Sequence, residues 1–162
     1  MYFKIKNMSV IKPPSPLTKN LKNQPKVFLA GSIEMGAAED WQKIISNTLS
    51  KHYVTIYNPR RDDWDSSWEQ KVENPQFYQQ VNWELNALEN SDIIIMYFSP
   101  ETKSPISLLE LGLYANSGKL VVYCPEGFWR KGNVDIVCEK YFIPNFDNWD
   151  KLINFVINKI EF

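Results

Sequence analysis

The chain has 162 residues, 44% of them hydrophobic, which suits a single domain with one well-formed core. Its formal net charge of -1 provides no positive field for a phosphate backbone, which excludes a nucleic acid polymer as a partner. No apolar run approaches the roughly 20 residues of a membrane-spanning helix, and the first residues lack the apolar stretch of a secretory signal. We therefore expect a cytoplasmic protein with no membrane partner.

Two cysteines and one histidine narrow the chemistry further. Cys124 and Cys138 do not form a Cys-x-x-Cys pair, and we interpret them as reduced core residues. His52 is the only histidine, which argues against Ser-His and Cys-His hydrolases and against a zinc site. No metal is expected, and chemistry based on carboxylates remains open.

The first half of the chain begins with a lead-in rich in Lys, Asn and Pro. We predict an extended segment over residues 1–24, whose opening residues can add an edge strand, and a domain over residues 25–162. A buried strand at 27–30 ends at Gly31-Ser32, a helix follows over 37–51, and a second strand at 53–57 stops at Asn58-Pro59. Residues 60–74 have no clean period and predict a long loop at the functional end.

The second half alternates more clearly between helices and strands. Pro75 suits the first turn of a helix, and the run at 93–98 is apolar on both faces, as in a central parallel strand. A helix over 105–116, a strand at 120–123, a short strand at 141–143 and a last helix over 149–160 complete the pattern.

This alternation predicts an α/β fold: a flavodoxin/Rossmann-like, doubly wound parallel sheet of five strands in the order 2-1-3-4-5. In such sheets ligands bind beyond the carboxyl ends of the strands, near the point where the strand order reverses. We therefore expect four loops, at 31–36, 58–68, 99–107 and 125–135, to surround one crevice.

Glu110 is the first candidate for chemistry. The segment from Ser107 to Glu110 matches the Ser-x-x-Glu capping box of a helix amino terminus, which on its own favours a structural role. The predicted helix nevertheless begins at the carboxyl end of the third strand and faces the expected crevice. A helix amino terminus also favours an ionised carboxylate, so the two roles are compatible.

Glu84 is the second candidate, because its spacing from Phe77, Val81 and Leu88 puts it on or beside the apolar stripe of its helix. It either extends to water or reaches the same cavity as Glu110. In the second case one carboxylate can act as a nucleophile while the other handles a proton. Attack on an anomeric carbon would then give a covalent glycosyl-enzyme.

Further candidate binding residues follow the predicted strands. Gly31 and Ser32 allow a close backbone approach, although glycine here also suits a simple tight turn. The loop after the second strand offers cations for a phosphate and a flat aromatic surface for a base. The alternative is that it is a solvated loop whose charges form ion pairs with one another. Its candidates are Asn58, Arg60, Arg61, Asp62 and Trp64. Asn133 and Asp135 are binding or turn residues.

Five segments taken together resemble the nucleoside 2-deoxyribosyltransferase family, particularly its deoxyribosyltransferase-like branch, from about residue 26 to residue 141. They are Val27-Phe28-Leu29-Ala30-Gly31-Ser32, Asn58-Pro59-Arg60-Arg61-Asp62, Gln80-Val81-Asn82-Trp83-Glu84, Ile106-Ser107-Leu108-Leu109-Glu110-Leu111-Gly112 and Gly132-Asn133-Val134-Asp135. The resemblance implies a flavodoxin-like fold, no cofactor, Glu110 as nucleophile and Glu84 as an acidic residue near the base.

The resemblance also implies that Asn133 of a neighbouring subunit completes the sugar site, so that the protein is a homo-oligomer with a shared active site. Ser107, in the nucleophile segment, is a further candidate for substrate binding. Well-known members of the family place an aspartate in the loop before the nucleophile, where this chain has Thr102-Lys103-Ser104-Pro105.

The leading hypothesis is that Glu110 attacks C1' of a 2'-deoxynucleoside and passes the deoxyribosyl group to a free nucleobase. Paired arginines suit a 5'-phosphate, so one alternative is a deoxynucleoside 5'-monophosphate N-hydrolase. A second alternative, from another class, is a nucleotide-binding sensor in which Glu110 only caps its helix.

Overall fold

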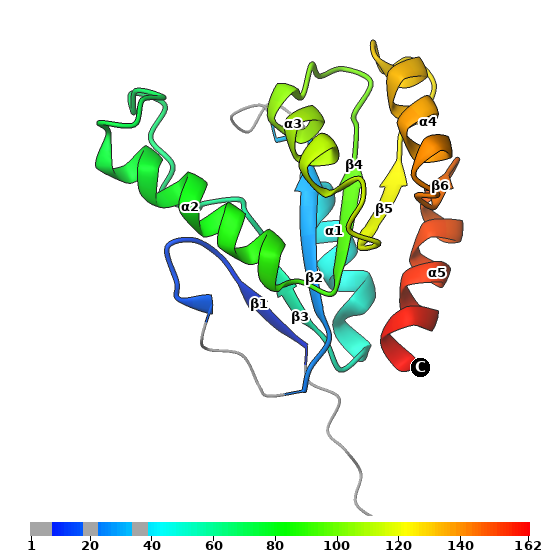
Figure 1. Ribbon diagram of the computed structural model, residues 1–162. Helices are drawn as coiled ribbons and strands as arrows, with labels where there is room; N and C mark the ends of the chain where they lie inside the picture. The colour runs from blue at the N-terminus through cyan, green and yellow to red at the C-terminus, as the bar shows by residue number, and fades with distance from the viewer. Residues whose placement is uncertain (1–7, 18–22, 34–38) are drawn as a thin grey trace, which may run out of the picture.

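One parallel sheet of six strands organises the protein. The computed structural model (Figure 1) describes residues 8–17, 23–33 and 39–162. The strand order is β1-β3-β2-β4-β5-β6. The strands are β1 (Ser9–Ile11), β2 (Lys26–Gly31), β3 (Thr55–Tyr57), β4 (Ile93–Tyr97), β5 (Leu120–Tyr123) and β6 (Asn145–Phe146). Without the edge strand β1, this is the predicted order 2-1-3-4-5. The doubly wound class is confirmed, and the sheet has six strands in place of the predicted five.

Helices cover both faces of the sheet. One core contains apolar side chains of α2 (Pro75–Asn90), α3 (Pro105–Tyr114) and α4 (Lys131–Lys140). The other contains those of α1 (Trp41–Thr48), the short 3-10 helix η3 (Leu49–Lys51) and α5 (Trp149–Glu161). Phe28 and Ala30 of β2 belong to the first core, and Val27 and Leu29 to the second. This alternation is the two-residue period of a strand that is buried on both faces.

Local sequence explains where the helices begin. Asp40, Asn74 and Asn148 each accept a hydrogen bond from the backbone N–H three residues ahead, which caps α1, α2 and α5. Pro75 and Pro105 occupy the first turns of α2 and α3, where proline costs no helical hydrogen bond. The predicted helices at residues 75, 105 and 149 therefore begin as expected, whereas residues 37–38 of the predicted first helix lie outside the described residues.

The region after β5 differs from the prediction. Residues 131–140 form α4, so Asn133 and Asp135 lie in a helix and the interpretation of them as turn residues is wrong. The helix buries only Val134 and Cys138, too short an apolar pattern to be recognised by periodicity. The predicted strand at 141–143 is also wrong, because Phe142 has a left-handed φ of 55° and the chain pairs with β5 only at β6.

The amino-terminal segment contributes to the sheet. β1 pairs in parallel with β3, and Ile11 is buried in the core on the α2 side. The boundary between residues 24 and 25 stays a prediction. None of the helices in residues 8–17, 23–33 and 39–162 is long and apolar enough to cross a membrane.

The order of the sheet reverses at β2, which pairs with β3 on one side and with β4 on the other. Gly31 ends β2 with a φ of 129°, and a Cβ atom there would lie 2.2 Å from the Tyr97 carbonyl oxygen. Only glycine fits this close approach between β2 and β4. Helices α2 and α3 both contact β2, which brings their side chains together over the reversal point.

Candidate active site

Two glutamates from these helices form a carboxyl pair. Glu84 lies in α2 and Glu110 in α3, and the negative charge of Glu84 acts on Glu110. Glu110 is buried, with 7% of its surface exposed, and Glu84 is partly buried. The charge of Glu84 thus influences Glu110 although the two residues are 26 positions apart in the sequence. That both side chains reach one cavity stays a prediction.

Burial dominates the protonation of this pair. Burial raises the pKa of Glu110 to about 8, and the charge of Glu84 raises it in the same direction. Burial raises the pKa of Glu84 to about 7, against the effect of a hydrogen bond from Gln80, which lowers it. Near neutral pH the two carboxyls therefore hold about one proton and one negative charge between them. One group can then act as a base or nucleophile while the other acts as an acid.

The capping-box interpretation of Glu110 is wrong. Helix α3 begins at Pro105 with Ser104 as its N-cap, so Glu110 lies in the second helical turn and not at the third helical position that a capping box requires. Burial raises the pKa of Glu110, which is the opposite direction to the lowering expected from a helix amino terminus. Ser107 is buried one turn before Glu110, on the same face of the helix.

Gln80 joins the pair to the loop after β3, and the sequence interpretation did not single it out. Its amide Nε2 donates to Glu84 Oε1 over 2.6 Å and to the Pro59 carbonyl oxygen over 3.0 Å. The sequence could have indicated this contact, because residues 80 and 84 are four positions apart and therefore lie on the same face of a helix.

A cluster of three buried hydroxyls fixes the start of α3. Ser32 Oγ lies 2.8 Å from Thr102 Oγ1 and 2.6 Å from Ser104 Oγ, and it accepts a hydrogen bond from the Ser99 backbone N–H. Ser104 is the N-cap of α3 and has a left-handed φ of 46°. The hydroxyl cluster thus joins the loops after β2 and β4, and it occupies the segment in which the family resemblance places an aspartate.

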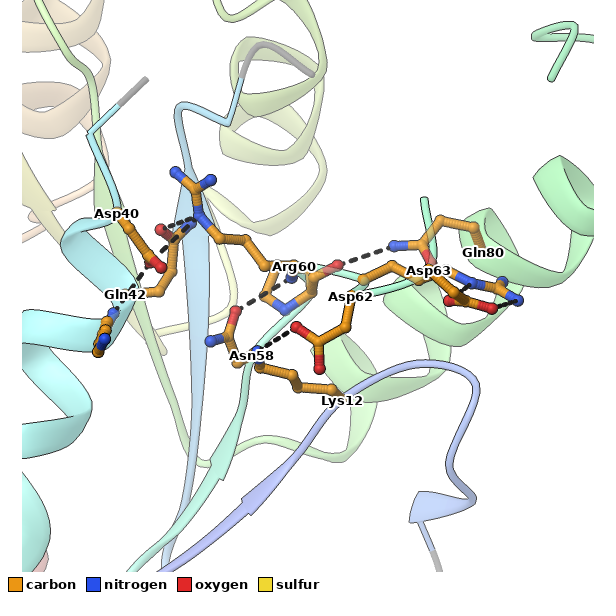
Figure 2. A network of polar contacts seen from close by, with 11 residues as sticks. Lys12, Asp40, Gln42, Asn58, Arg60, Asp62, Asp63 and Gln80 are labelled. Atoms are coloured by element: carbon orange, nitrogen blue, oxygen red, sulfur yellow. Dashed lines mark hydrogen bonds and ion pairs between the residues drawn. The ribbon is translucent and has the colours of Figure 1, made fainter. Parts of the chain in front are cut away.

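Arg60 extends from the end of β3 toward the start of α1 (Figure 2). Its Nε donates to Gln42 Oε1 over 2.9 Å and lies 3.2 Å from Asp40 Oδ1, and its Nη2 donates to the Glu39 carbonyl oxygen. Asn58 Oδ1 accepts from the Arg60 backbone N–H, which shapes the turn. These contacts use the guanidinium to attach the loop to α1.

Arg61 is held by protein groups as well. It donates to Asp63 Oδ1 over 2.7 Å and to Gln79 Oε1 over 3.0 Å, and its guanidinium carbon lies 4.9 Å from the centre of the Trp68 ring. Trp64 packs edge-on against Trp68, with ring centres 5.2 Å apart. The two arginines and the tryptophans therefore make the internal contacts that the alternative interpretation of this loop expected.

The remaining predicted site residues do not join the carboxyl pair. Asp62 makes an ion pair with Lys12 over 2.8 Å, and Asp135 accepts from Lys131 and Asn145. Asn133 is exposed on α4. Within the described parts of the chain, no three His, Cys, Asp or Glu side chains are grouped to hold a metal ion. A cavity of about 610 Å³ borders Pro25 and Asp92, at the amino ends of β2 and β4, and involves neither glutamate.

Comparison with known proteins adds the family and the fold. The family model described as "Nucleoside 2-deoxyribosyltransferase like" matches residues 24–128, a range that contains both glutamates and ends before Asn133. A crystal structure of a conserved protein from Enterococcus faecalis V583 is similar with a TM-score of 0.61 at 12% identity, over 84% of this chain and 99% of that chain. At this identity the likeness concerns the fold alone. No curated protein matches the sequence significantly.

Proposed function

The chain belongs to the nucleoside 2-deoxyribosyltransferase-like family, and on this premise we propose that it transfers a 2-deoxyribosyl group from a 2'-deoxynucleoside to a free nucleobase. The observation that carries the proposal is the pair of carboxyls, the buried Glu110 and the partly buried Glu84, whose raised pKa values leave about one proton between them near neutral pH. This is the protonation state that a carboxylate nucleophile with a neighbouring acid needs. No cofactor takes part in the proposed reaction.

In the first step a Glu110 carboxylate oxygen attacks C1', and the bond between C1' and the base nitrogen breaks. Glu84 gives its proton to the departing base, and the deoxyribosyl group becomes an ester of Glu110. In the second step the new base attacks C1', Glu84 takes back a proton from that base, and the Glu110 carboxylate is released. Two displacements at C1' retain the configuration of the sugar, and water is the competing acceptor.

The contacts of the arginines favour a nucleoside over a 5'-monophosphate as substrate. Arg60 and Arg61 already contact carboxylates, amide oxygens and a backbone carbonyl of the protein. A phosphate would have to replace these partners. The sensor alternative depended on Glu110 as a helix cap, and the start of α3 at Pro105 removes that role.

We also propose that the enzyme acts as a homo-oligomer with a shared site. Asn133 is exposed on α4 in this chain, so its side chain is available to a second copy. Three large apolar residues, Ile106, Leu109 and Leu113, are exposed on α3, the helix that carries Glu110. An Asn133→Ala protein and a Glu110→Ala protein, each inactive alone, should regain activity when mixed. Sedimentation as a monomer with full activity would contradict the shared site.

The function is tested by incubating the purified protein with deoxyinosine and adenine and separating the products chromatographically. The proposal predicts deoxyadenosine with the wild type and none with Glu110→Ala. Glu89→Ala serves as the matched control, because Glu89 is an exposed glutamate of α2. Free deoxyribose without deoxyadenosine would indicate hydrolysis, and the same assay with dIMP measures the monophosphate alternative. Intact substrate after prolonged incubation with the wild type would contradict both reactions.

A further inference from the structure

Gln80 is the residue that fixes one oxygen of the carboxyl pair. Its side chain is buried, with 6% of the residue exposed, and both of its strong amide contacts come from the same nitrogen. Nε2 carries two hydrogens, and the two acceptors, Glu84 Oε1 and the Pro59 carbonyl oxygen, use both. The amide is therefore fully engaged as a donor.

The orientation of this amide is determined by its acceptors. If the amide were rotated by half a turn, Gln80 Oε1 would face the Pro59 carbonyl oxygen and Glu84 Oε1. The carbonyl oxygen cannot donate a hydrogen bond, and Glu84 Oε1 can donate one only when it is protonated. In the observed orientation Gln80 Oε1 is buried and has no hydrogen-bond partner among residues 8–17, 23–33 and 39–162, an unfavourable state for an amide oxygen. The side chain thus leaves its own acceptor unsatisfied while it donates to Glu84.

We propose that Gln80 is a positioning residue of the reaction: by keeping Glu84 Oε1 as a hydrogen-bond acceptor, it makes Glu84 the charged member of the pair and leaves the shared proton on Glu110 in the resting protein. The inference rests on the proposed function. Before attack, the Glu110 O–H bond breaks and a bond forms between the proton and Glu84 Oε2, the oxygen that Gln80 does not hold. The pair keeps one proton and one negative charge throughout.

The surroundings of the pair allow a single donor to have this effect. Among the residues that the structure describes, Gln80 is the hydrogen-bond donor that lowers the pKa of Glu84, and burial is the opposing influence. Within residues 8–17, 23–33 and 39–162, the titratable groups on α3 that belong to this environment are Glu110 and Tyr114, and the pKa of Tyr114 lies above its ordinary value of 10.0, so Tyr114 is neutral at physiological pH. Removing the Gln80 donor should therefore change the titration of the pair directly.

The test compares Gln80→Met with the wild type and with Asn82→Met as a matched control. Methionine fills a similar volume without a donor, and Asn82 is an amide of the same helix that donates to the Tyr78 carbonyl oxygen. The glutamate carboxyl carbons are titrated by NMR, which needs no turnover, and kcat/KM is measured against pH. Gln80→Glu, which is isosteric, provides a second variant if Gln80→Met does not fold.

In Gln80→Met we expect the lower apparent pKa of the pair to rise by about one pH unit, because the charged form loses a donor. The acid limb of kcat/KM should move by the same amount, while KM should change by less than about threefold. Gln80→Glu should move the titration in the same direction, and Asn82→Met should not move it.

A folded Gln80→Met protein whose pair titrates within about 0.2 pH units of the wild type would overturn the inference. If the wild type transfers deoxyribose and Gln80→Met keeps its pH profile, the role of Gln80 fails while the proposed function stands. If the wild type is inactive but the NMR titration moves, the proposed function fails and the control of Glu84 by Gln80 stands.

Discussion

Two polar regions of this protein treat their charges in opposite ways. The loop after β3 places Arg60, Arg61 and Asp63 among hydrogen bonds and ion pairs with partners of the protein itself. Of the carboxyl pair, Glu110 is buried and Glu84 partly buried, and no cation in the described parts of the chain lowers the pKa of either glutamate. The charges of the loop are therefore paired with protein groups. The carboxyl pair instead carries a negative charge in surroundings where burial disfavours the charged form. This contrast supports our proposal that the pair, and not the loop, is the chemical centre.

The largest effect should come from neutralising the pair. Glu110→Gln removes the proposed nucleophile and should lower kcat by on the order of 10³-fold or more, measured as deoxyadenosine formed from deoxyinosine and adenine. The matched variant Glu89→Gln, at an exposed glutamate of α2, should keep the wild-type rate. Wild-type turnover by Glu110→Gln would break the comparison, because the buried pair would then be a structural feature.

The same substitution should stabilise the fold in a pH-dependent way. Burial raises the pKa of Glu110 from its ordinary value of 4.5 to about 8, so the folded state binds more protons than the unfolded state between these values. Wild-type stability should therefore fall as pH rises from about 4.5 to 8. Glu110→Gln should raise the free energy of unfolding at pH 8 by roughly 1–3 kcal/mol and by little at pH 5.

Urea unfolding of both proteins at the two pH values measures this difference. Glu89→Gln should give a stability difference from the wild type that is the same at both pH values, since Glu89 is exposed. A gain for Glu110→Gln that is equal at pH 5 and pH 8 would mean that the carboxyl is not held protonated by burial.

A smaller effect is expected in the loop. Arg61→Met removes contacts with Asp63, Gln79 and Trp68, so the melting temperature should fall by a few degrees. The ratio of kcat/KM for deoxyinosine over dIMP should change by less than about threefold, because the guanidinium is already occupied by protein groups. A selective loss of activity toward dIMP by about 100-fold would instead assign a phosphate to Arg61 and favour the N-hydrolase alternative.

The sequence was informative where a residue pattern has one structural meaning. The apolar run of β4 and the stripe of α2 predicted both elements, and β2 to β5 appear in the expected order. It failed at α4, where Val134 and Cys138 are the only buried residues of the helix. It also counted five strands, because the three residues of β1 become a strand only through pairing with β3.

The candidate site was predicted to a similar degree and for similar reasons. The helix period placed Glu84 beside an apolar stripe and left two outcomes open, an extension to water or an approach to Glu110. The hydroxyl cluster of Ser32, Thr102 and Ser104 could not be predicted. Ser32 is 70 or more positions away from the other two residues, and Ser104 has a left-handed backbone conformation that its residue type does not indicate. The density of charge in the loop after β3 suggested ligand binding. The charges in fact pair with other groups of the protein, and a sequence does not reveal such pairings.

The most direct measurement is to trap the proposed intermediate. The protein is incubated with a 2'-fluoro-2'-deoxynucleoside, which slows release of the sugar, then digested and analysed by mass spectrometry. We predict one added fluorodeoxyribosyl group on the peptide that contains Glu110, and none in Glu110→Gln. An active protein that carries no adduct, or carries it on a residue other than Glu110, would contradict this account.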